Sequence, residues 1–285
     1  MTGVVADLVR ILRVQKAAAF GLIVILIYCL VAIFGPVFFQ VGNDSHPELA
    51  YEGPSASHVL GTDAFGRDVL TALIVGARPI MEIGVLAAIM TIGVGVIVGL
   101  ASGYLGGALD TAIMRVTDVF LTIPGMPLVI VIAALIHSSN PLVLAAVLSI
   151  QAWAGLARAV RSQALSLRTS DFIVAARGQA LPLRHMIGRQ LLPNVGSYVA
   201  IHFLLSITGA IYAGVGLFLL GIAPVSGTNW GLMINIAQSQ GALYSTQSAL
   251  YLLAPMAAIV LLQVAFVLFS RALDDLFNPR MRVHR

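Results

Sequence analysis

The chain contains little charge and almost no cysteine. Only 10% of its 285 residues are charged, whereas a soluble domain carries about 25%. Cys29 is the single cysteine, which excludes an intrachain disulfide. Apolar residues take the place of the missing charge, since 59% of the chain is hydrophobic and its mean hydropathy is +0.97. This composition excludes a soluble globular domain and indicates an integral membrane protein.

Motifs of common hydrolytic and metal-dependent enzymes are also missing. The sequence has no phosphate-binding Walker loop, no Gly-x-Ser-x-Gly and no His-Glu-x-x-His. The six histidines are scattered, and His58 with Asp63 supplies too few ligands for a metal site. We therefore expect no catalytic residue, no metal site and no cofactor in this chain, and no ATP hydrolysis by the chain itself.

Six apolar segments predict an all-α membrane protein with six transmembrane helices. They cover about residues 17–39, 83–104, 113–136, 141–160, 195–222 and 249–270, and each is long enough to cross the hydrocarbon core. The first is too long for a signal-peptide core and lacks an Ala-x-Ala cleavage site, so we expect it to be retained. The expected organisation is an N-terminal segment (1–16), the first span, a polar and acidic loop (40–82), a core (83–270) and a tail (271–285).

The distribution of Lys and Arg predicts the orientation. With the N-terminus inside, the cytoplasmic segments carry three basic residues before the first span, one between the second and third, six between the fourth and fifth, and four after the sixth. These are 14 of the 16 basic residues, and only Arg67 and Arg78 remain outside. The positive-inside rule thus predicts a multi-pass cell-membrane protein with both termini in the cytoplasm. Because the positive charge is divided by membrane side, the net charge of +4 does not indicate a nucleic-acid partner.

Four glycines recur at a fixed spacing near the end of the second apolar segment. Gly95, Gly99, Gly103 and Gly107 are each four residues apart, which places them on one stripe of a helix where another backbone can approach closely. The other explanation is the general enrichment of glycine in membrane helices. We expect close helix packing along this stripe.

Residues 171–194, here called the hairpin segment, separate the fourth and fifth apolar segments. The segment carries arginines that do not belong in lipid, together with many apolar residues, and Pro182 divides it, which predicts two short helices. Small residues would let the first helix enter a groove on a soluble partner. These are Ala175, Ala176, Gly178 and Ala180. The alternative is an amphipathic linker whose arginines contact anionic membrane lipid.

Few polar side chains lie in the fifth and sixth apolar segments. We expect Ser206, Thr208, Tyr212 and Gln263 either to line a transport path or to bond to a neighbouring helix, which is the usual role of such groups. No Asp, Glu, Lys or Arg lies well inside the six expected spans, since Glu82 and Asp110 come at segment ends. This absence argues against a proton- or ion-coupled carrier.

Residues 58–68, here called the loop motif, read His-Val-Leu-Gly-Thr-Asp-Ala-Phe-Gly-Arg-Asp. Gly61 and Gly66 permit tight turns, while Asp63, Arg67 and Asp68 can satisfy one another and nearby amides. One interpretation, which includes His58, is a self-bonded loop that stiffens this side of the protein. The other is direct contact with a partner or a substrate.

Both segments resemble those of one transporter family. The loop motif resembles the external His-x-Leu-Gly-Thr-Asp-x-x-Gly-Arg-Asp sequence of permeases from ABC importers of the dipeptide, oligopeptide and nickel type. The hairpin segment resembles the cytoplasmic coupling loop of binding-protein-dependent permeases, whose pattern is Glu-Ala-Ala, a later Gly and Ile-x-Leu-Pro. Ala175, Ala176 and Arg177 match its beginning, and 192–194 match its Leu-Pro-Asn end. Val174 replaces the Glu and Ala180 the Gly, which removes any polar contact of that Glu with the ATPase.

The resemblance covers about residues 55–280 and implies a type I ABC importer permease fold, with a coupling helix between the fourth and fifth of six spans. It implies a non-enzymatic subunit of an ATP-driven inner-membrane importer of di- or oligopeptides. The implied partners are a second permease, two ATP-binding subunits that hold ATP and Mg, and an external substrate-binding protein. The implied coupling residues are Ala175, Ala176, Arg177, Gly178, Ala180, Pro182, Arg184 and Pro193. Import of nickel or another small solute, and secondary transport without an ATPase, are the alternatives.

Overall fold

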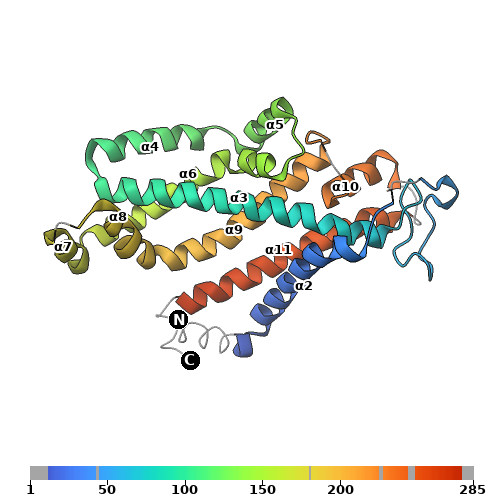
Figure 1. Cartoon of the computed structure of the whole chain (residues 1–285), viewed down its shortest axis with the longest axis horizontal. Helices are drawn as coiled ribbons and strands as arrows, with labels where there is room; N and C mark the ends of the chain where they lie inside the picture. Colours follow the sequence, from blue (N-terminus) through green and yellow to red (C-terminus); the bar gives the residue numbers. More distant parts are fainter. Residues whose placement is uncertain (1–11, 43–44, 180, 225–226, 243–247, 278–285) are drawn as a thin grey trace.

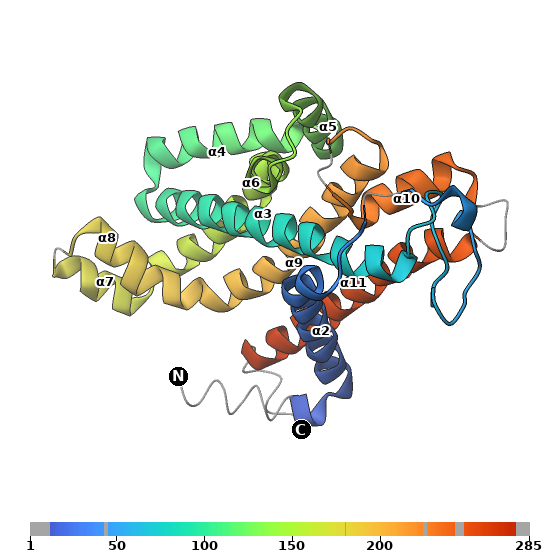
Figure 2. The ribbon, with the colours of Figure 1, turned by 45° about the vertical axis from the view of Figure 1, so that its right-hand side comes forward.

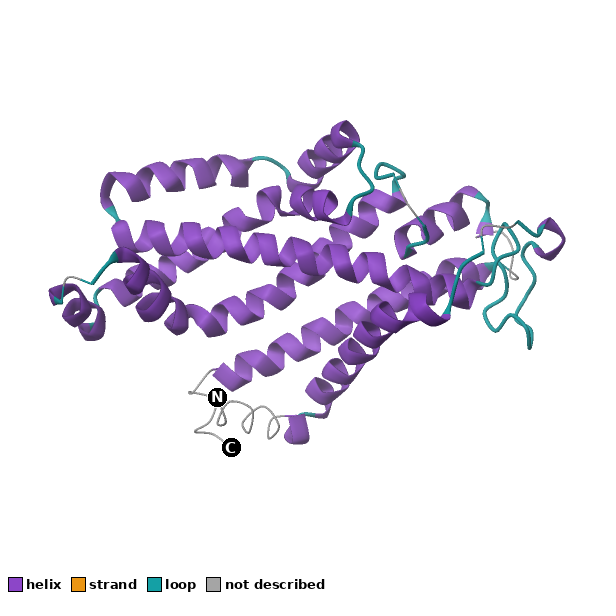
Figure 3. Cartoon of the chain, viewed as in Figure 1, coloured by secondary structure: helices purple, strands orange, loops and turns teal. Residues whose placement is uncertain are grey.

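A computed structural model describes residues 12–42, 45–179, 181–224, 227–242 and 248–277. The described part of the chain is helical apart from its connections, and its only β-type pairing is an isolated bridge between Thr62 and Asp68. The longest irregular segment is the loop that precedes Val69 (Figure 3). The predicted all-α fold is therefore confirmed. Ala180 and residues 278–285, to which the sequence assigned coupling and tail roles, lie outside the described residues.

Ten α-helices follow one another along the described part of the chain. They are α2 (Lys16–Phe38), α3 (Val69–Leu105), α4 (Gly107–Thr122), α5 (Gly125–Ile136), α6 (Pro141–Arg168), α7 (Asp171–Gly178), α8 (Leu183–His185), α9 (Leu192–Leu219), α10 (Trp230–Ser239) and α11 (Ala249–Phe277). A 3₁₀ turn, η1 (Pro47–Leu49), lies in the loop, and a π-helical turn, η2 (Met186–Leu191), joins α8 to α9. Five helical runs are long and apolar enough to cross a membrane, or six if α4 and α5 count as one broken span.

The long helix α3 is the centre of the bundle. It packs along α6 over most of its length and also contacts α9 and α2, while α11 packs on α2, α9 and α10 (Figure 1). Helix α4 lies along the outer side of α3 and α6. Helices α7 and α8 lie at one end of α3, and the irregular loop before Val69 lies at the opposite end (Figures 1 and 2). We call these the hairpin end and the loop end.

Helix α3 begins at Val69, fourteen residues before the expected start of the second span. Asp68 caps it, because its carboxylate accepts a hydrogen bond from the Thr71 amide at 2.7 Å. Pro79 is accommodated inside the helix. The expectation of a loop up to residue 82 is therefore wrong. Glu82 lies within the helix and not at its end.

The third apolar segment is a bent pair of helices. Helices α4 and α5 meet at an angle of 85° across a short break. Pro124 explains the break, because a proline disfavours helical backbone at the preceding residue, and Ile123 is extended (φ −79°, ψ 130°). The prediction of one continuous span over residues 113–136 is wrong in this respect.

The polar segment between the fifth and sixth spans contains a helix that the sequence analysis did not predict. Helix α10 begins at Trp230, which is only 1% exposed. Its indole nitrogen donates a hydrogen bond to the Leu73 carbonyl at 2.8 Å, and its ring packs edge-on against Tyr28. Asn229 caps the helix through the Leu232 amide. Helix α10 therefore fastens α2 and α3 together near the loop end.

The glycine stripe packs α3 against α6, as predicted for three of its four members. A Cβ atom on Gly99 would lie 2.6 Å from the Ala157 carbonyl oxygen, and one on Gly103 would lie 2.6 Å from the Ala164 Cβ. Gly95 faces Leu156 in the same way. Gly107 is the exception, because α3 ends at Leu105 and a Cβ at Gly107 would meet nothing within 4 Å. The prediction for Gly107 is wrong.

Candidate functional site

The loop motif is organised around the carboxylate of Asp63, which is 2% exposed. One of its oxygens accepts hydrogen bonds from the amides of Phe65 (2.8 Å) and Arg67 (2.9 Å). The other accepts from the Arg67 side chain, at 2.9 Å from Nε and 2.8 Å from the second guanidinium nitrogen. The guanidinium also lies over the Phe65 ring. The expected mutual satisfaction of Asp63 and Arg67 is thus present in the structure.

Two glycines and a histidine complete the loop motif. Gly61 and Gly66 have φ values of +77° and +74°, so both turns need the left-handed backbone that glycine adopts readily. His58 lies 3.3 Å from the Asp68 carboxylate that caps α3. The motif therefore forms a rigid cap that is continuous with the central helix.

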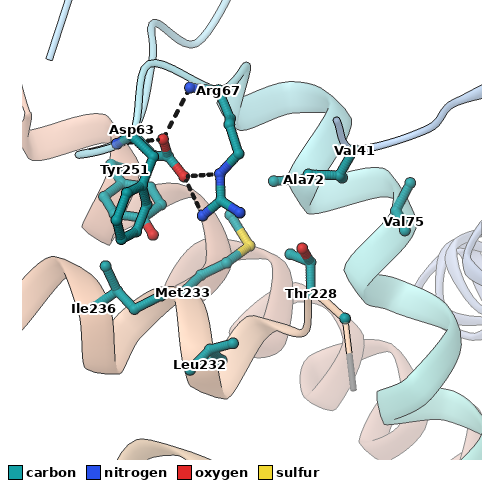
Figure 4. A pocket seen from close by; sticks show the side chains of 12 residues that line it. Val41, Asp63, Arg67, Ala72, Val75, Thr228, Leu232, Met233, Ile236 and Tyr251 are labelled. Carbon is teal, nitrogen blue, oxygen red and sulfur yellow. Dashed lines mark hydrogen bonds and ion pairs between the residues drawn. The ribbon is translucent and has the colours of Figure 1, made fainter. Parts of the chain in front are cut away.

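A cavity of about 430 Å³ lies beside the loop motif, against α10 and α11 (Figure 4). Asp63, Arg67 and Tyr251 form its polar side, and Met233 and Ile236 lie opposite (Figure 4). Just outside it, burial raises the pKa of the Tyr51 hydroxyl, and the negative Asp63 carboxylate adds to this shift. Because the Asp63 carboxylate is already saturated by hydrogen bonds, the cavity offers no free anion for a ligand.

At the hairpin end, α7 packs on the bundle through a few apolar side chains. Ile173 is fully buried and Ala176 is 5% exposed, and both belong to a cluster with Leu100, Val160 and Met186. The small-residue pattern predicted that Ala176 lies on a surface that enters a partner's groove. That expectation is wrong, because Ala176 is buried in the protein's own apolar cluster, where α7 packs against α6 and η2. Its neighbour Ala175 is exposed, because successive residues of a helix point in directions about 100° apart.

The exposed face of the hairpin segment combines apolar and basic residues. Val174 is 57% exposed and Leu183 is 43% exposed, although both are apolar. The other exposed members at predicted coupling positions are Ala175, Arg177, Gly178, Pro182, Arg184 and Pro193. The structure therefore brings the described coupling residues together at one end of the molecule, with Ala176 alone turned inward.

Arg177 ties the hairpin segment to the end of α3. Its guanidinium lies 4.6 Å from the centre of the Tyr104 ring and reaches the Tyr104 carbonyl oxygen at 3.5 Å. A cation is favourable there because the carbonyls of a helix C-terminus carry partial negative charge. The sequence predicted a second short helix after Pro182. The chain instead forms one continuous helical run from Leu183 to Leu219. Motion of the hairpin segment is therefore mechanically linked to α9.

The four predicted path residues do not gather at one place. Gln263 is 4% exposed and donates from α11 to the Thr208 carbonyl on α9 at 3.3 Å, and the Thr208 hydroxyl bonds within its own helix. Tyr212 is 56% exposed, and Ser206 is half-buried. Gln263 and Thr208 thus join two helices, which is the alternative given above, while Tyr212 has the exposure that a path requires.

A buried ion pair near the hairpin end was missed by the sequence analysis. Asp110 of α4 receives two hydrogen bonds of 2.6 Å from the Arg161 guanidinium of α6 and a further bond from the Ser102 hydroxyl of α3. The 51-residue separation of Asp110 and Arg161 hides the pair from local motifs. Its role is structural, since it joins three helices. Among the described residues, no three His, Cys, Asp or Glu side chains lie close enough to hold a metal ion.

Comparison with protein families gives two matches. The profile described as binding-protein-dependent transport system inner membrane component matches residues 95–283. The profile described as N-terminal TM domain of oligopeptide transport permease C matches residues 5–54. Together they cover the first span, the end of α3 and the helices that follow it, including the hairpin segment.

Curated relatives align along nearly the whole chain. The dipeptide transport system permease protein DppC of Alkalihalophilus pseudofirmus is 32% identical over 95% of this chain and 88% of its own length. The oligopeptide transport system permease protein OppC of Bacillus subtilis is 30% identical over 95% of this chain and 88% of its own length. The glutathione transport system permease protein GsiD of Pectobacterium atrosepticum is 32% identical over 96% of this chain and 90% of its own length.

Proposed function

Because this chain belongs to the family of binding-protein-dependent transport system inner membrane components, we propose that it is a permease subunit of an ATP-driven importer of di- or oligopeptides. The observation that carries the proposal is the two-sided hairpin segment. One side is buried on α3 and α6, and the other presents apolar and basic side chains. Such a surface suits a soluble subunit that must move the bundle. The relatives' names support a peptide cargo.

The proposed assembly contains a homologous second permease, two ATP-binding subunits and an external substrate-binding protein. ATP and Mg belong to the ATP-binding subunits, and this chain carries out no covalent chemistry. Closure of the ATP-binding subunits would move the hairpin segment, and the apolar cluster around Ile173 would pass that motion to α3 and α6. The bundle is then the bistable element that opens alternately to the two sides, and ATP biases its two states.

The proposed orientation places the hairpin end in the cytoplasm and the loop end outside. The Lys and Arg distribution supports it, and the distance between the two ends along α3 allows a direct test. In a Cys29→Ala background, Ser57→Cys, directly before the loop motif, should react with a membrane-impermeant maleimide on intact cells. Gln179→Cys in the hairpin segment should react only after permeabilisation. External labelling at Gln179→Cys would contradict the orientation.

The coupling role is tested by two adjacent alanines with opposite exposure. Ala175→Trp adds bulk to the exposed side of α7, so the purified chain should melt normally while stimulation of ATP hydrolysis by loaded binding protein falls at least about tenfold. Ala176→Trp is the control for internal damage. It overfills the chain's own cluster, which typically costs about 1–3 kcal/mol, so it should lower the melting temperature. Normal stimulation with Ala175→Trp would remove the hairpin segment as the coupling element.

A further inference from the structure

Two oppositely charged side chains lie part-way along the central helix. Arg78 is the tenth and Glu82 the fourteenth residue of the 37-residue α3. At 1.5 Å per residue they lie about 14 and 20 Å from its first residue, in a helix of about 55 Å. The hydrocarbon core is only about 30 Å thick, so the helix is long enough to project beyond it on both sides. Neither residue is at a helix terminus.

Both side chains are exposed, and neither has an ion-pair or hydrogen-bond partner in the part of the chain that the structure describes. Their spacing of four residues places them on one face of α3. The residues between and beside them, Ile80, Met81 and Ile83, are buried in the apolar core. An unpaired charge in contact with lipid tails is costly. This face of α3 must therefore meet water or a polar group, and not the hydrocarbon of the bilayer.

Two hollows adjoin the pair. One of about 430 Å³ lies between α3 and α2 and is lined by Arg78, Glu82 and apolar residues such as Ala32 and Val85. The other, of about 270 Å³, is lined by Arg78 and Glu82 together with Ser139, Asn229 and Phe218. Sites for small solutes are typically mostly apolar, about 300–1,000 Å³ in volume, and contain a few converging polar groups. The larger hollow falls within this range of volume and the smaller lies just below it, and the same two charges line both.

We propose that Arg78 and Glu82 recognise the charged ends of the transported solute. Arg78 would receive a carboxylate, for which the planar guanidinium offers two parallel hydrogen bonds, and Glu82 would receive an ammonium group. The adjoining hollows would take apolar side chains. The solute class is a zwitterionic peptide with free termini, so the inference rests on the proposed function. A charge pair that only stabilised the fold would be expected to bond internally, as Asp110 and Arg161 do.

The test uses the complete importer in proteoliposomes, with an equimolar mixture of dipeptides and tripeptides as the probe and mass spectrometry to measure uptake. Arg78→Gln and Glu82→Gln should each lower peptide uptake per ATP hydrolysed about tenfold, since each removes one charge-assisted contact. Arg78→Lys should recover part of the loss. Arg158→Gln, which removes an exposed arginine of α6, is the matched control and should transport as the wild type does.

Blocked peptides give each charge its own readout. In Arg78→Gln, the preference for free over C-terminally amidated peptides should fall, and in Glu82→Gln the preference for free over N-acetylated peptides should fall. The inference is overturned if uptake per ATP and both preferences equal the wild type. It is also overturned if the single variants prevent assembly of the complex, or if the double variant restores uptake, because the charges would then serve a subunit interface or only each other. Absence of peptide uptake by the wild type would instead overturn the proposed function.

Discussion

The two ends of the molecule are ordered by different kinds of interaction. At the loop end, Asp63 binds the amides and side chain of residues two to four positions away, and Asp68 caps the helix that follows it. At the hairpin end, Gly99 contacts α6 across 58 residues of sequence, and Ile173 packs in a cluster that includes Leu100. The loop end is held by hydrogen bonds between residues close in sequence, whereas the hairpin end is held by apolar contacts between residues far apart in sequence.

This difference explains why the two ends tolerate different changes. A hydrogen-bonded loop depends on the chemistry of single atoms, so replacing one carboxylate oxygen disturbs it even when the shape is kept. A close helix contact depends on shape, so added volume disturbs it even when polarity is kept. Substitutions that change either volume or charge alone should therefore affect the two ends differently.

The largest effect is expected from added volume at the hairpin end. Gly99→Leu would place a side chain where a Cβ alone already lies 2.6 Å from a backbone oxygen. Overpacking typically costs about 1–3 kcal/mol of stability. Because the atom in the way is a backbone oxygen that cannot move aside easily, we expect a loss of about 3 kcal/mol at this site. Thermal unfolding in detergent should show the loss. Gly93→Leu is the matched control on the same helix, since a Cβ there meets nothing within 4 Å. Equal melting of both variants would show that α3 and α6 are not closely packed.

An intermediate effect is expected at the buried ion pair between α4 and α6. Asp110→Asn leaves Arg161 without its partner charge, and breaking a buried pair costs about 3–5 kcal/mol. Because the Arg161 side chain is 29% exposed, we expect about 2 kcal/mol. Asp118→Asn breaks the exposed pair with Arg158 between the same two helices and should cost less than about 0.5 kcal/mol. Chemical denaturation of the two variants measures the difference, and similar costs would mean that water reaches Asp110 freely.

The smallest global effect is expected at the loop end. Asp63→Asn keeps the shape but removes the charge that Arg67 binds, at a cost of about 1–2 kcal/mol. Because the contacts are local, faster amide hydrogen exchange should be confined to residues 58–68, with little change in the melting temperature. Glu48→Gln, an exposed carboxylate of the same loop, should leave exchange unchanged. Accelerated exchange throughout α3 would show that the loop motif holds the whole helix in place.

The sequence predicted most of what depends on composition or on near neighbours. The helical membrane fold followed from the apolar segments, and the bonding of Asp63 with Arg67 followed from the opposite charges that lie close together in the loop motif. The glycine stripe correctly indicated a closely packed helix face, although it did not identify α6 as the partner. The prediction of a single span over 113–136 was wrong because mean hydropathy contains no information about the direction of the helix axis. Pro124 bends the chain there without making the segment more polar.

Other features depend on contacts that no local pattern contains. The burial of Ala176 and the exposure of Ala175 are decided by the position of α3 and α6 beneath α7. The pairing of Asp110 with Arg161 requires α4 to fold back along α6. The exposure of Arg78 and Glu82 beside two hollows depends on how α2, α6 and α9 surround α3. The sequence by itself determined the apolar helices and the self-bonded loop, because those rest on composition and short-range geometry. Only the tertiary structure decided which face of each helix is free to bind, because that depends on which neighbour covers it.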